Sequence, residues 1–171
     1  SPTSYHAVAE LTRRLEQAGF QRLEETESWP SVEGRRYVVR DGALIAWITP
    51  EKVTPQLGAR IVGSHTDSPS FKLKPNATVT NQGWQQVGME VYGGGLLNSW
   101  LDRDLGLSGR LVTCDGQAHL VRTGPILRIS QLAPHLDRTV NDDLKLDRQR
   151  HLMPILSVGK PDLDVEDLLC E

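Results

Sequence analysis

The sequence has few cysteines, no long apolar run and no large excess of either charge, and each absence excludes a class of protein. Its 171 residues include two cysteines, Cys114 and Cys170, which are too few for a disulfide framework and fit a reducing cytoplasm. No apolar run approaches the ~20 residues that a membrane-spanning helix needs. With 19 basic and 22 acidic residues the net charge is −3, which excludes a strongly basic nucleic-acid binder and a polybasic membrane anchor.

The amino-terminal residues, Ser1 to Ser4, contain neither the charged stretch nor the apolar stretch of a secretory signal peptide. They also lack an initiator methionine, so we expect that upstream residues have been removed. A hydrophobic content of 38% is enough for one compact domain or two small ones. We therefore expect a globular cytoplasmic protein that binds neither nucleic acid nor membranes.

The order of apolar and turn residues predicts one helix followed by short strands. Apolar residues at spacings of three and four predict a helix that is capped by Ser4 at its start and by Gly19 at its end. Asp41-Gly42 and Asp115-Gly116 each lie between runs rich in β-forming residues, which predicts two β-hairpins.

The composition changes after Pro75, where glycine becomes frequent and helical periodicity disappears. We place a boundary between residues 76 and 86, with an α/β part before it and a mostly β part after it. Residues 141–150 are charged and poor in apolar groups, which predicts a mobile loop. Residues 164–169 predict the start of a helix.

The segment Ser64 to Pro69 is the sharpest functional feature. Residues 60–64 form a short β-branched run that predicts a buried strand, and His65 follows at its end. The sheets of α/β proteins place ligand-binding groups at the carboxyl ends of their strands. Imidazole is a good zinc ligand, and the carboxylate of Asp67 can fix its tautomer. The alternative is a polar loop that Asp67 caps, without a metal.

Three other features each allow a functional and a structural interpretation. Gly93-Gly94-Gly95 matches neither nucleotide-binding glycine pattern, which favours a tight turn over a phosphate loop. Asp102 and Asp104 flank Arg103, and a salt-bridged turn is favoured over a metal site. His135 has apolar neighbours, which favours a packed histidine over a substrate contact.

Several stretches taken together carry a family resemblance. They are SPTSYHA, GSHTDSP, KLKPN, VGMEVYGGG, WLDRDL, GR and QLAPHL, at residues 1–7, 63–69, 72–76, 87–95, 100–105, 109–110 and 131–136. In this order they resemble the aspartyl aminopeptidases, a family of dinuclear zinc exopeptidases, and most of all its bacterial branch.

The resemblance implies an α/β fold class with a split architecture. In that family an α/β metallopeptidase domain is interrupted by a mostly β insertion domain that drives oligomerisation, and the composition break near Pro75 falls where the insertion would begin. Residues 1–80 would then be the N-terminal part of the metallopeptidase domain, and residues 81–171 an incomplete oligomerisation domain. Family members assemble as homo-oligomeric dodecamers.

The resemblance also implies roles for three residues. His65 would be a zinc ligand, and Asp67 the nearby catalytic carboxylate that orients it. His135 would contact peptide substrate in the active site of a neighbouring subunit. The implied activity is zinc-dependent removal of N-terminal, typically acidic, residues from peptides at a site with two zinc ions.

The sequence departs from the family pattern in its later metal ligands. No Glu-Glu pair follows His65 to supply the general base and its neighbouring ligand. We therefore expect the chain to be the N-terminal portion of a longer enzyme and to be inactive alone. The alternative is a non-catalytic oligomerisation or interaction protein derived from the same family.

Overall fold

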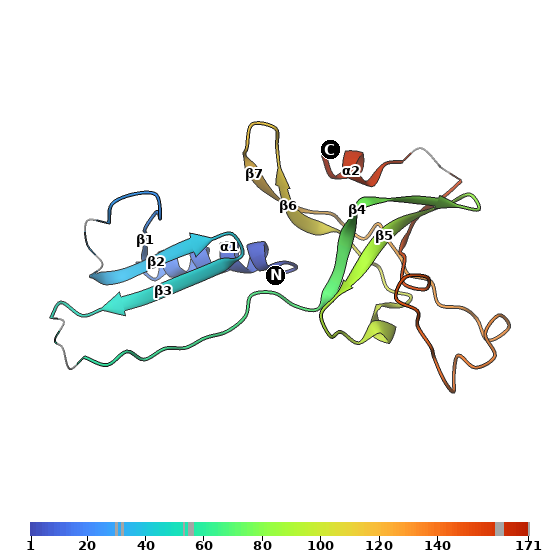
Figure 1. Cartoon of the computed structure of the whole chain (residues 1–171), viewed down its shortest axis with the longest axis horizontal. Coiled ribbons are helices and arrows are strands. Elements are labelled where there is room, and N and C mark those ends of the chain that lie inside the picture. The colour runs from blue at the N-terminus through green and yellow to red at the C-terminus, as the bar shows by residue number, and fades with distance from the viewer. Residues whose placement is uncertain (30, 32, 53, 55–56, 160–162, 171) are drawn as a thin grey trace. The chain divides into compact units, whose positions relative to one another are not determined.

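The computed structural model describes residues 1–29, 31, 33–52, 54, 57–159 and 163–170 (Figure 1). The chain divides into two compact units. The first unit comprises Ser1–Ser68 and Ser108–Leu120, and the second comprises Pro69–Leu107 and Val121–Glu171. Helices and small sheets occur together in the chain, which agrees with the predicted α/β class. None of the described helices is long and apolar enough to cross a membrane.

The first unit contains a helix, a three-stranded sheet and most of a second hairpin. The helix and the sheet strands are α1 (Ser4–Gln17), β1 (Gln21–Arg22), β2 (Gly34–Arg40) and β3 (Ala43–Thr49). The sheet order is β1-β2-β3, with β1 parallel to β2 and β2 antiparallel to β3. The turn between β2 and β3 is Asp41-Gly42, which confirms the first predicted hairpin.

The helix begins and ends close to its predicted caps. The N-cap is Thr3 rather than Ser4, because the Thr3 hydroxyl accepts a hydrogen bond from the backbone N–H of His6 at 3.2 Å. Serine and threonine cap helices by the same hydrogen bond, so the sequence alone does not show which of the adjacent Thr3 and Ser4 is the cap. At the other end Gly19 follows the C-cap Ala18 with a φ of 79°, a backbone conformation that favours glycine.

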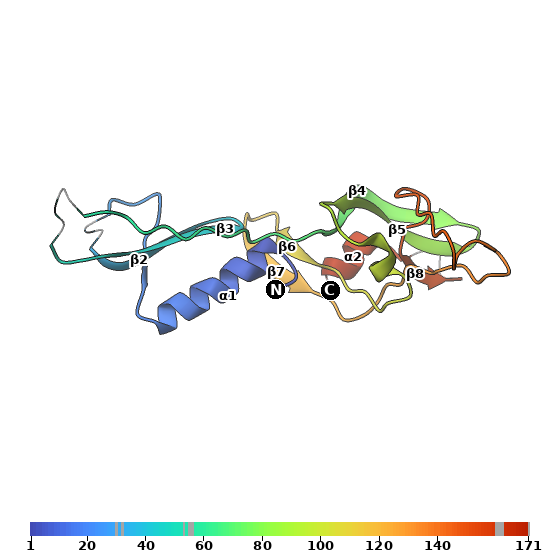
Figure 2. The same cartoon turned by 90° about the horizontal axis from the view of Figure 1, so that it is seen from below.

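Helix α1 lies along one face of the sheet (Figure 2). Val8 of the helix and Tyr37 of β2 are the only buried apolar side chains in the described part of this unit. The Tyr37 hydroxyl donates a hydrogen bond to Glu16 Oε1 at 2.8 Å. Arg35 lies on the same face and donates to the Ala18 carbonyl at 2.6 Å. The contact between helix and sheet is therefore small and partly polar.

Tyr37 gives the first unit a predicted sensitivity to alkaline pH. Burial and the hydrogen bond to Glu16 raise the pKa of Tyr37 to about 12. A tyrosine in the unfolded chain ionises near pH ~10, so between about pH 10 and 12 the folded state holds a proton that the unfolded state has lost. The Tyr37 contribution to stability should therefore be complete below about pH 10 and fall as the pH rises toward about 12.

Urea unfolding at about pH 8 and pH 11 measures this effect. In the Tyr37→Phe variant the part of the alkaline fall that Tyr37 causes should be absent. The Tyr92→Phe variant is the matched control and should keep the fall of the unchanged chain. An identical fall in the chain and in Tyr37→Phe would show that other groups cause it.

The second hairpin is joined to the first by a charged contact. Strands β6 (Ser108–Val112) and β7 (Ala118–Arg122) flank Asp115-Gly116, which confirms the second predicted hairpin. Arg110 Nη1 lies 2.5 Å from Asp41 Oδ1, and its guanidinium lies 4.4 Å from the centre of the Tyr5 ring. This contact connects β6 to the turn between β2 and β3 and to the start of α1.

The second unit is built on an antiparallel sheet in the order β4-β5-β8. Its elements are β4 (Ser70–Asn81), β5 (Trp84–Tyr92), the 3₁₀ helix η1 (Leu97–Trp100), β8 (Ile155–Val158) and α2 (Val165–Cys170). The position of α2 confirms the helix predicted from residues 164–169. Pairing between β4 and β5 shifts register between Leu73 and Thr78. Pro75 lies in this interval and has no N–H to donate, which explains an irregularity there.

The predicted boundary at residues 76–86 falls inside the β4–β5 hairpin, whereas the compact unit begins at Pro69. The composition change after Pro75 therefore coincides with an irregularity in a strand. The assignment of residues 1–80 and 81–171 to separate functional domains stays a prediction.

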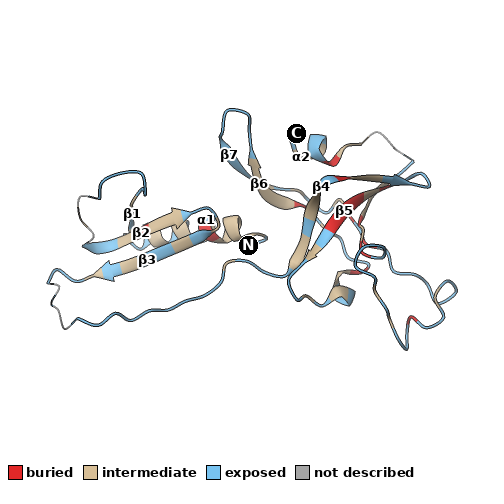
Figure 3. Cartoon of the chain, in the orientation of Figure 1, coloured by how far each residue is buried: buried red, intermediate tan, exposed pale blue. Residues whose placement is uncertain are grey.

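The core of the second unit gathers around β5 (Figure 3). One cluster of buried side chains includes Val87 and Met89, and a second consists of Leu101, Ile129 and Leu152. Buried Gln85 donates to the Leu163 carbonyl and accepts from the Ser157 hydroxyl at 3.1 Å, so its polar atoms are satisfied.

The buried strand predicted at residues 60–64 is wrong for this chain. No strand is assigned there, and Ile61 and Val62 are 88% and 97% exposed. A strand is stabilised by a hydrogen-bonded neighbour and by layers that cover its faces, and no described residue supplies either to this segment. A local run of β-branched residues predicts a strand but does not provide its partner.

Candidate metal-binding histidine

His65 and Asp67 lie next to each other in an exposed loop of the first unit. His65 Nδ1 lies 2.7 Å from the backbone carbonyl oxygen of Asp67 and 3.5 Å from Asp67 Oδ1. Because a carbonyl oxygen can only accept, the short contact places the ring proton on Nδ1. Nε2 then carries the lone pair that a metal ion needs. The short contact to the ring is thus made by the Asp67 carbonyl, and orientation by the Asp67 carboxylate stays a prediction.

The loop around His65 is tied to the first hairpin by one hydrogen bond. The Thr66 hydroxyl donates to the Gly42 carbonyl at 2.6 Å, in the turn between β2 and β3. The His65 side chain is nonetheless 78% exposed. The imidazole therefore contacts the loop backbone through Nδ1 and is otherwise largely exposed.

The donor set around His65 fits a zinc ligand but not a whole zinc site. Zinc sites take three or four protein ligands, commonly histidine nitrogens and carboxylate oxygens. Among the residues that the structure describes, no group of three or more histidine, cysteine, aspartate or glutamate side chains is close enough to hold a metal ion. His65 can supply one ligand, and a complete site needs ligands from beyond the described residues.

Asp102 and Asp104 form the salt-bridged turn that the sequence favoured over a metal site. Arg128 is their shared partner, at 3.5 Å from an oxygen of each carboxylate. The adjacent Arg103 instead donates to the Ser99 carbonyl at 3.3 Å. The sequence placed the two carboxylates around Arg103, and that partner is wrong: the ion pairs are made by Arg128, which is distant in the chain.

Gly93 forms the tight turn that was favoured over a phosphate loop. Its φ is 77°, and a Cβ atom there would lie 3.3 Å from Pro69. Both the backbone conformation and the close approach favour glycine at this position.

His135 lies on an exposed turn in the second unit. The turn is closed by backbone hydrogen bonds from Leu136 and Asp137 to the Ala133 carbonyl, at 2.9 and 3.1 Å. The favoured alternative, a histidine packed in an apolar surround, is therefore wrong within this chain. The contact with substrate stays a prediction, and His135 belongs to a different compact unit from His65 and Asp67.

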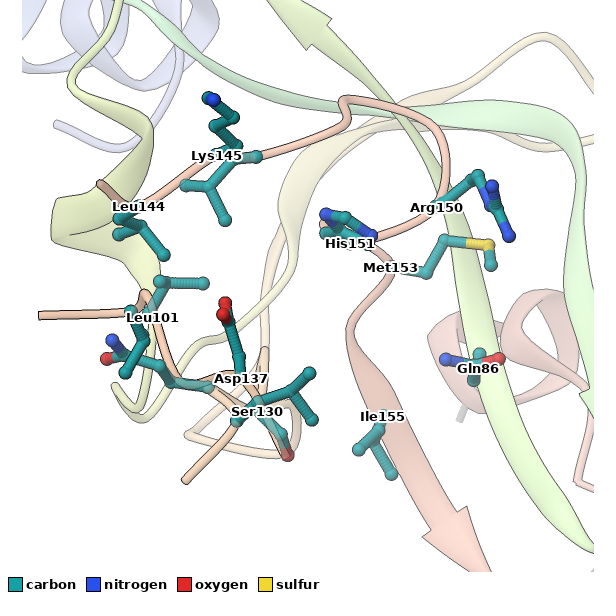
Figure 4. Close-up of a pocket in the computed structure, with 14 residues that line it drawn as sticks. Gln86, Leu101, Ser130, Asp137, Leu144, Lys145, Arg150, His151, Met153 and Ile155 are labelled. Carbon is teal, nitrogen blue, oxygen red and sulfur yellow. The ribbon is translucent and has the colours of Figure 1, made fainter. Parts of the chain in front are cut away.

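The second unit also contains a pocket that sequence reasoning missed (Figure 4). Its volume is about 220 Å³, and its lining includes the polar groups of Lys145, Arg150, His151 and Asp137 beside apolar side chains such as Leu144. The sequence predicted only a loop at residues 141–150, and these residues indeed contain no helix or strand. The pocket exists because this loop folds against β5 and β8, a contact that no local pattern encodes.

Comparison with known families identifies the chain's relatives. The family model for aminopeptidase I zinc metalloproteases (M18) matches residues 1–167. The chain belongs to this family. The match confirms the resemblance to zinc aminopeptidases, and the family description makes zinc the metal of the family.

The relatives are longer proteins. The chain is 56% identical over 161 residues to a probable M18 family aminopeptidase 2 of Streptomyces avermitilis, a match that covers 93% of this chain and 37% of the relative. It is 46% identical over 179 residues to the Pseudomonas entomophila protein of the same name, covering all of this chain and 42% of the relative. A cryo-EM structure of the Ape4 and Nbr1 complex matches with a TM-score of 0.84 and 36% identity, covering 94% of this chain and 32% of that chain. The M18 chain described here therefore spans about two fifths of the curated relatives it matches.

Proposed function

We propose that this M18 chain is part of a zinc-dependent aminopeptidase and supplies His65 as one of its zinc ligands. The observation that carries the proposal is the His65 ring, whose Nδ1 faces the Asp67 carbonyl at 2.7 Å and whose Nε2 bonds to no described residue. A histidine held in this tautomer presents one metal-binding nitrogen in a fixed orientation. Bound zinc would polarise a peptide carbonyl and activate water at the site.

Asp67 and His135 have proposed roles in the same site. The Asp67 carboxylate lies 3.5 Å from the His65 ring, and we propose that it acts as the neighbouring catalytic group. His135, on its exposed turn, is proposed to reach substrate in the active site of a neighbouring subunit. The exposure of His135 supports this role.

The proposed substrates are peptides with an acidic N-terminal residue, and two zinc ions are proposed for each complete site. The proposed assembly is a homo-oligomer, a dodecamer as in the family that the sequence resembles, through residues 81–171. The proposed compartment is the cytoplasm, in keeping with two exposed free cysteines.

The test is an aminopeptidase assay on the full natural polypeptide that contains these residues. We expect hydrolysis of fluorogenic substrates with N-terminal aspartate or glutamate, loss of activity after chelation, and recovery when zinc is returned. The 171-residue chain alone should be inactive, since its described residues supply no three-ligand site.

Two other results would change the proposed function. Hydrolysis of alanyl or leucyl substrates in preference to acidic ones would retain the enzyme and overturn its specificity. A full polypeptide that assembles, retains no zinc and cleaves none of these substrates would favour a non-catalytic oligomerisation protein.

A further inference from the structure

The pocket of the second unit contains polar groups that the proposed zinc site does not use (Figure 4). All of its lining residues belong to the second unit, and His65, Asp67 and His135 are not among them. Its volume of about 220 Å³ lies below the ~300–1,000 Å³ of sites for drug-sized ligands. The pocket therefore fits a small molecule.

Aliphatic side chains form the apolar part of the lining. Leu101 is buried, and Leu144 and Leu146 pack against the cluster of buried side chains to which it belongs. These contacts hold the loop of residues 141–150 in place although the loop contains no helix or strand. The pocket thus offers aliphatic surface that is already packed, and an apolar ligand group can bury area against it.

Asp137 supplies a carboxylate of which one oxygen is unbonded. Its Oδ1 accepts a hydrogen bond from the Thr139 backbone N–H at 3.1 Å and another from the Thr139 hydroxyl at 2.9 Å. Its Oδ2 accepts none from the described residues, and no described basic side chain forms an ion pair with this carboxylate. A cationic ligand group can therefore bind at Oδ2 without displacing a contact within the chain.

Arg150 and His151 supply hydrogen-bond donors. The Arg150 guanidinium donates to no described residue. It lies near Asp147, whose Oδ1 already accepts from the backbone N–H groups of Gln149 and Arg150 at 2.9 Å. His151 Nδ1 accepts from the Asp147 backbone N–H at 3.1 Å, which places the ring proton on Nε2. The guanidinium and the Nε2–H can therefore both donate to an anionic ligand group.

Gln86 adds a neutral polar group to the lining. Its side chain is half-buried on β5, and the amide makes no hydrogen bond to a described residue. A carboxamide can both donate and accept, and a peptide group has one donor and one acceptor. Gln86 is therefore a suitable partner for the peptide group of a ligand.

We propose that this pocket binds a dipeptide with an aliphatic N-terminal residue and two free termini. The N-terminal ammonium would pair with Asp137, and the C-terminal carboxylate with Arg150 and His151. Asp137 and Arg150 lie on different sides of the pocket, which suits a ligand whose charges are separated by a peptide group (Figure 4). A ligand with one charge would leave the carboxylate or the guanidinium without a partner. The inference goes beyond the proposed function and does not depend on the zinc role of His65.

Titration of the isotope-labelled 171-residue chain with leucylglycine, followed by NMR, tests the site. Chelator is present, so that a failure of the zinc proposal does not affect the result. We expect a Kd of about 1 mM, typical of a ligand of this size, with shifts centred on the amides around the pocket. N-acetyl-leucylglycine lacks the ammonium and leucylglycinamide lacks the carboxylate, so each should bind about tenfold more weakly.

Two variants and a control test the assigned contacts. Asp137→Asn removes the charge but keeps the Oδ1 that accepts from Thr139. Arg150→Gln removes the guanidinium but keeps the backbone N–H that donates to Asp147. Each should weaken leucylglycine binding about tenfold. Arg148→Gln, at an exposed arginine of the same loop outside the lining, should leave binding unchanged.

Four results would overturn the dipeptide site. The first is no binding at tenfold the expected Kd. The second is equal affinity for leucylglycine and its two blocked analogues, a comparison that uses the unchanged chain and so stands even if a variant fails to fold. The third is equal affinity for free leucine, which would remove the role of the peptide group. The fourth is binding that disappears as the chain concentration rises, which would identify a second copy of the chain as the occupant.

Discussion

Replacing His65 with alanine in the full-length protein is expected to remove zinc from the site and to abolish peptide hydrolysis. In the proposed site the imidazole is one of three or four zinc ligands, and the described residues around it form no group of three that could hold the metal without it. Loss of an outer-shell partner alone costs about 10- to 100-fold in metal affinity, so loss of a ligand should cost more than ~100-fold. Zinc content after dialysis, measured by mass spectrometry, gives a readout that does not depend on activity.

The matched control for this prediction is His119→Ala. His119 is an exposed histidine of β7 with no proposed role in the site, so its removal should leave zinc content and activity unchanged. Retention of stoichiometric zinc by the His65→Ala protein would show that the metal is held by other residues. The assignment of the Nε2 lone pair to zinc would then be wrong.

Asp67 should affect zinc through the His65 ring in two separable ways. Its backbone carbonyl makes the short contact, and any residue at position 67 keeps a carbonyl there. Its carboxylate lies farther from the ring, and only side-chain substitution removes it. The carbonyl contact to the ring therefore survives any substitution at position 67, whereas the negative charge beside the ring does not.

Local signals account for the elements that the sequence predicted correctly. The Asp-Gly turns are encoded by two adjacent residues, and both hairpins formed around them. Helix α1 follows from apolar spacing and from a cap one residue away from the predicted one. Each of these elements is stabilised mainly by residues close in the sequence, which is why a sequence pattern identifies them.

Non-local contacts explain what the sequence did not reveal. Residues 60–64 have strand composition but no partner among the described residues, and composition alone could not show this. The partner of Asp102 and Asp104 is Arg128, which the fold brings from a distant segment. His135 lies between apolar residues in sequence, yet its turn holds it at the surface.

In the candidate site, too, the sequence revealed the local contacts and not the non-local ones. The His65–Asp67 pair was found because both residues lie in one short loop, within reach of each other whatever the rest of the fold does. The remaining zinc ligands could not be inferred from spacing, since a site completed by distant segments leaves no local pattern. The family resemblance supplied that part of the interpretation, and His65 is the one ligand proposed from the described residues.

The His135→Phe variant of the full-length enzyme is expected to fold and bind zinc but to lose about 10²- to 10³-fold in kcat. That is the typical cost of removing one hydrogen-bond donor from a developing oxyanion. Because His135 is exposed on its turn, its replacement should leave the melting temperature of the isolated chain nearly unchanged. His119→Phe is the control and should alter neither kcat nor zinc content.

Mixed oligomers test whether His135 acts across a subunit boundary. A His135→Phe subunit keeps its own His65, and a His65→Ala subunit keeps its own His135. If the histidine serves a neighbour's site, a hybrid of the two contains sites in which an intact His65 meets an intact His135, and activity should partly return. Native mass spectrometry establishes that hybrids have formed. Hybrids without recovered activity would place His135 in its own subunit's chemistry or outside the site, because each subunit of the mixture lacks one of the two histidines.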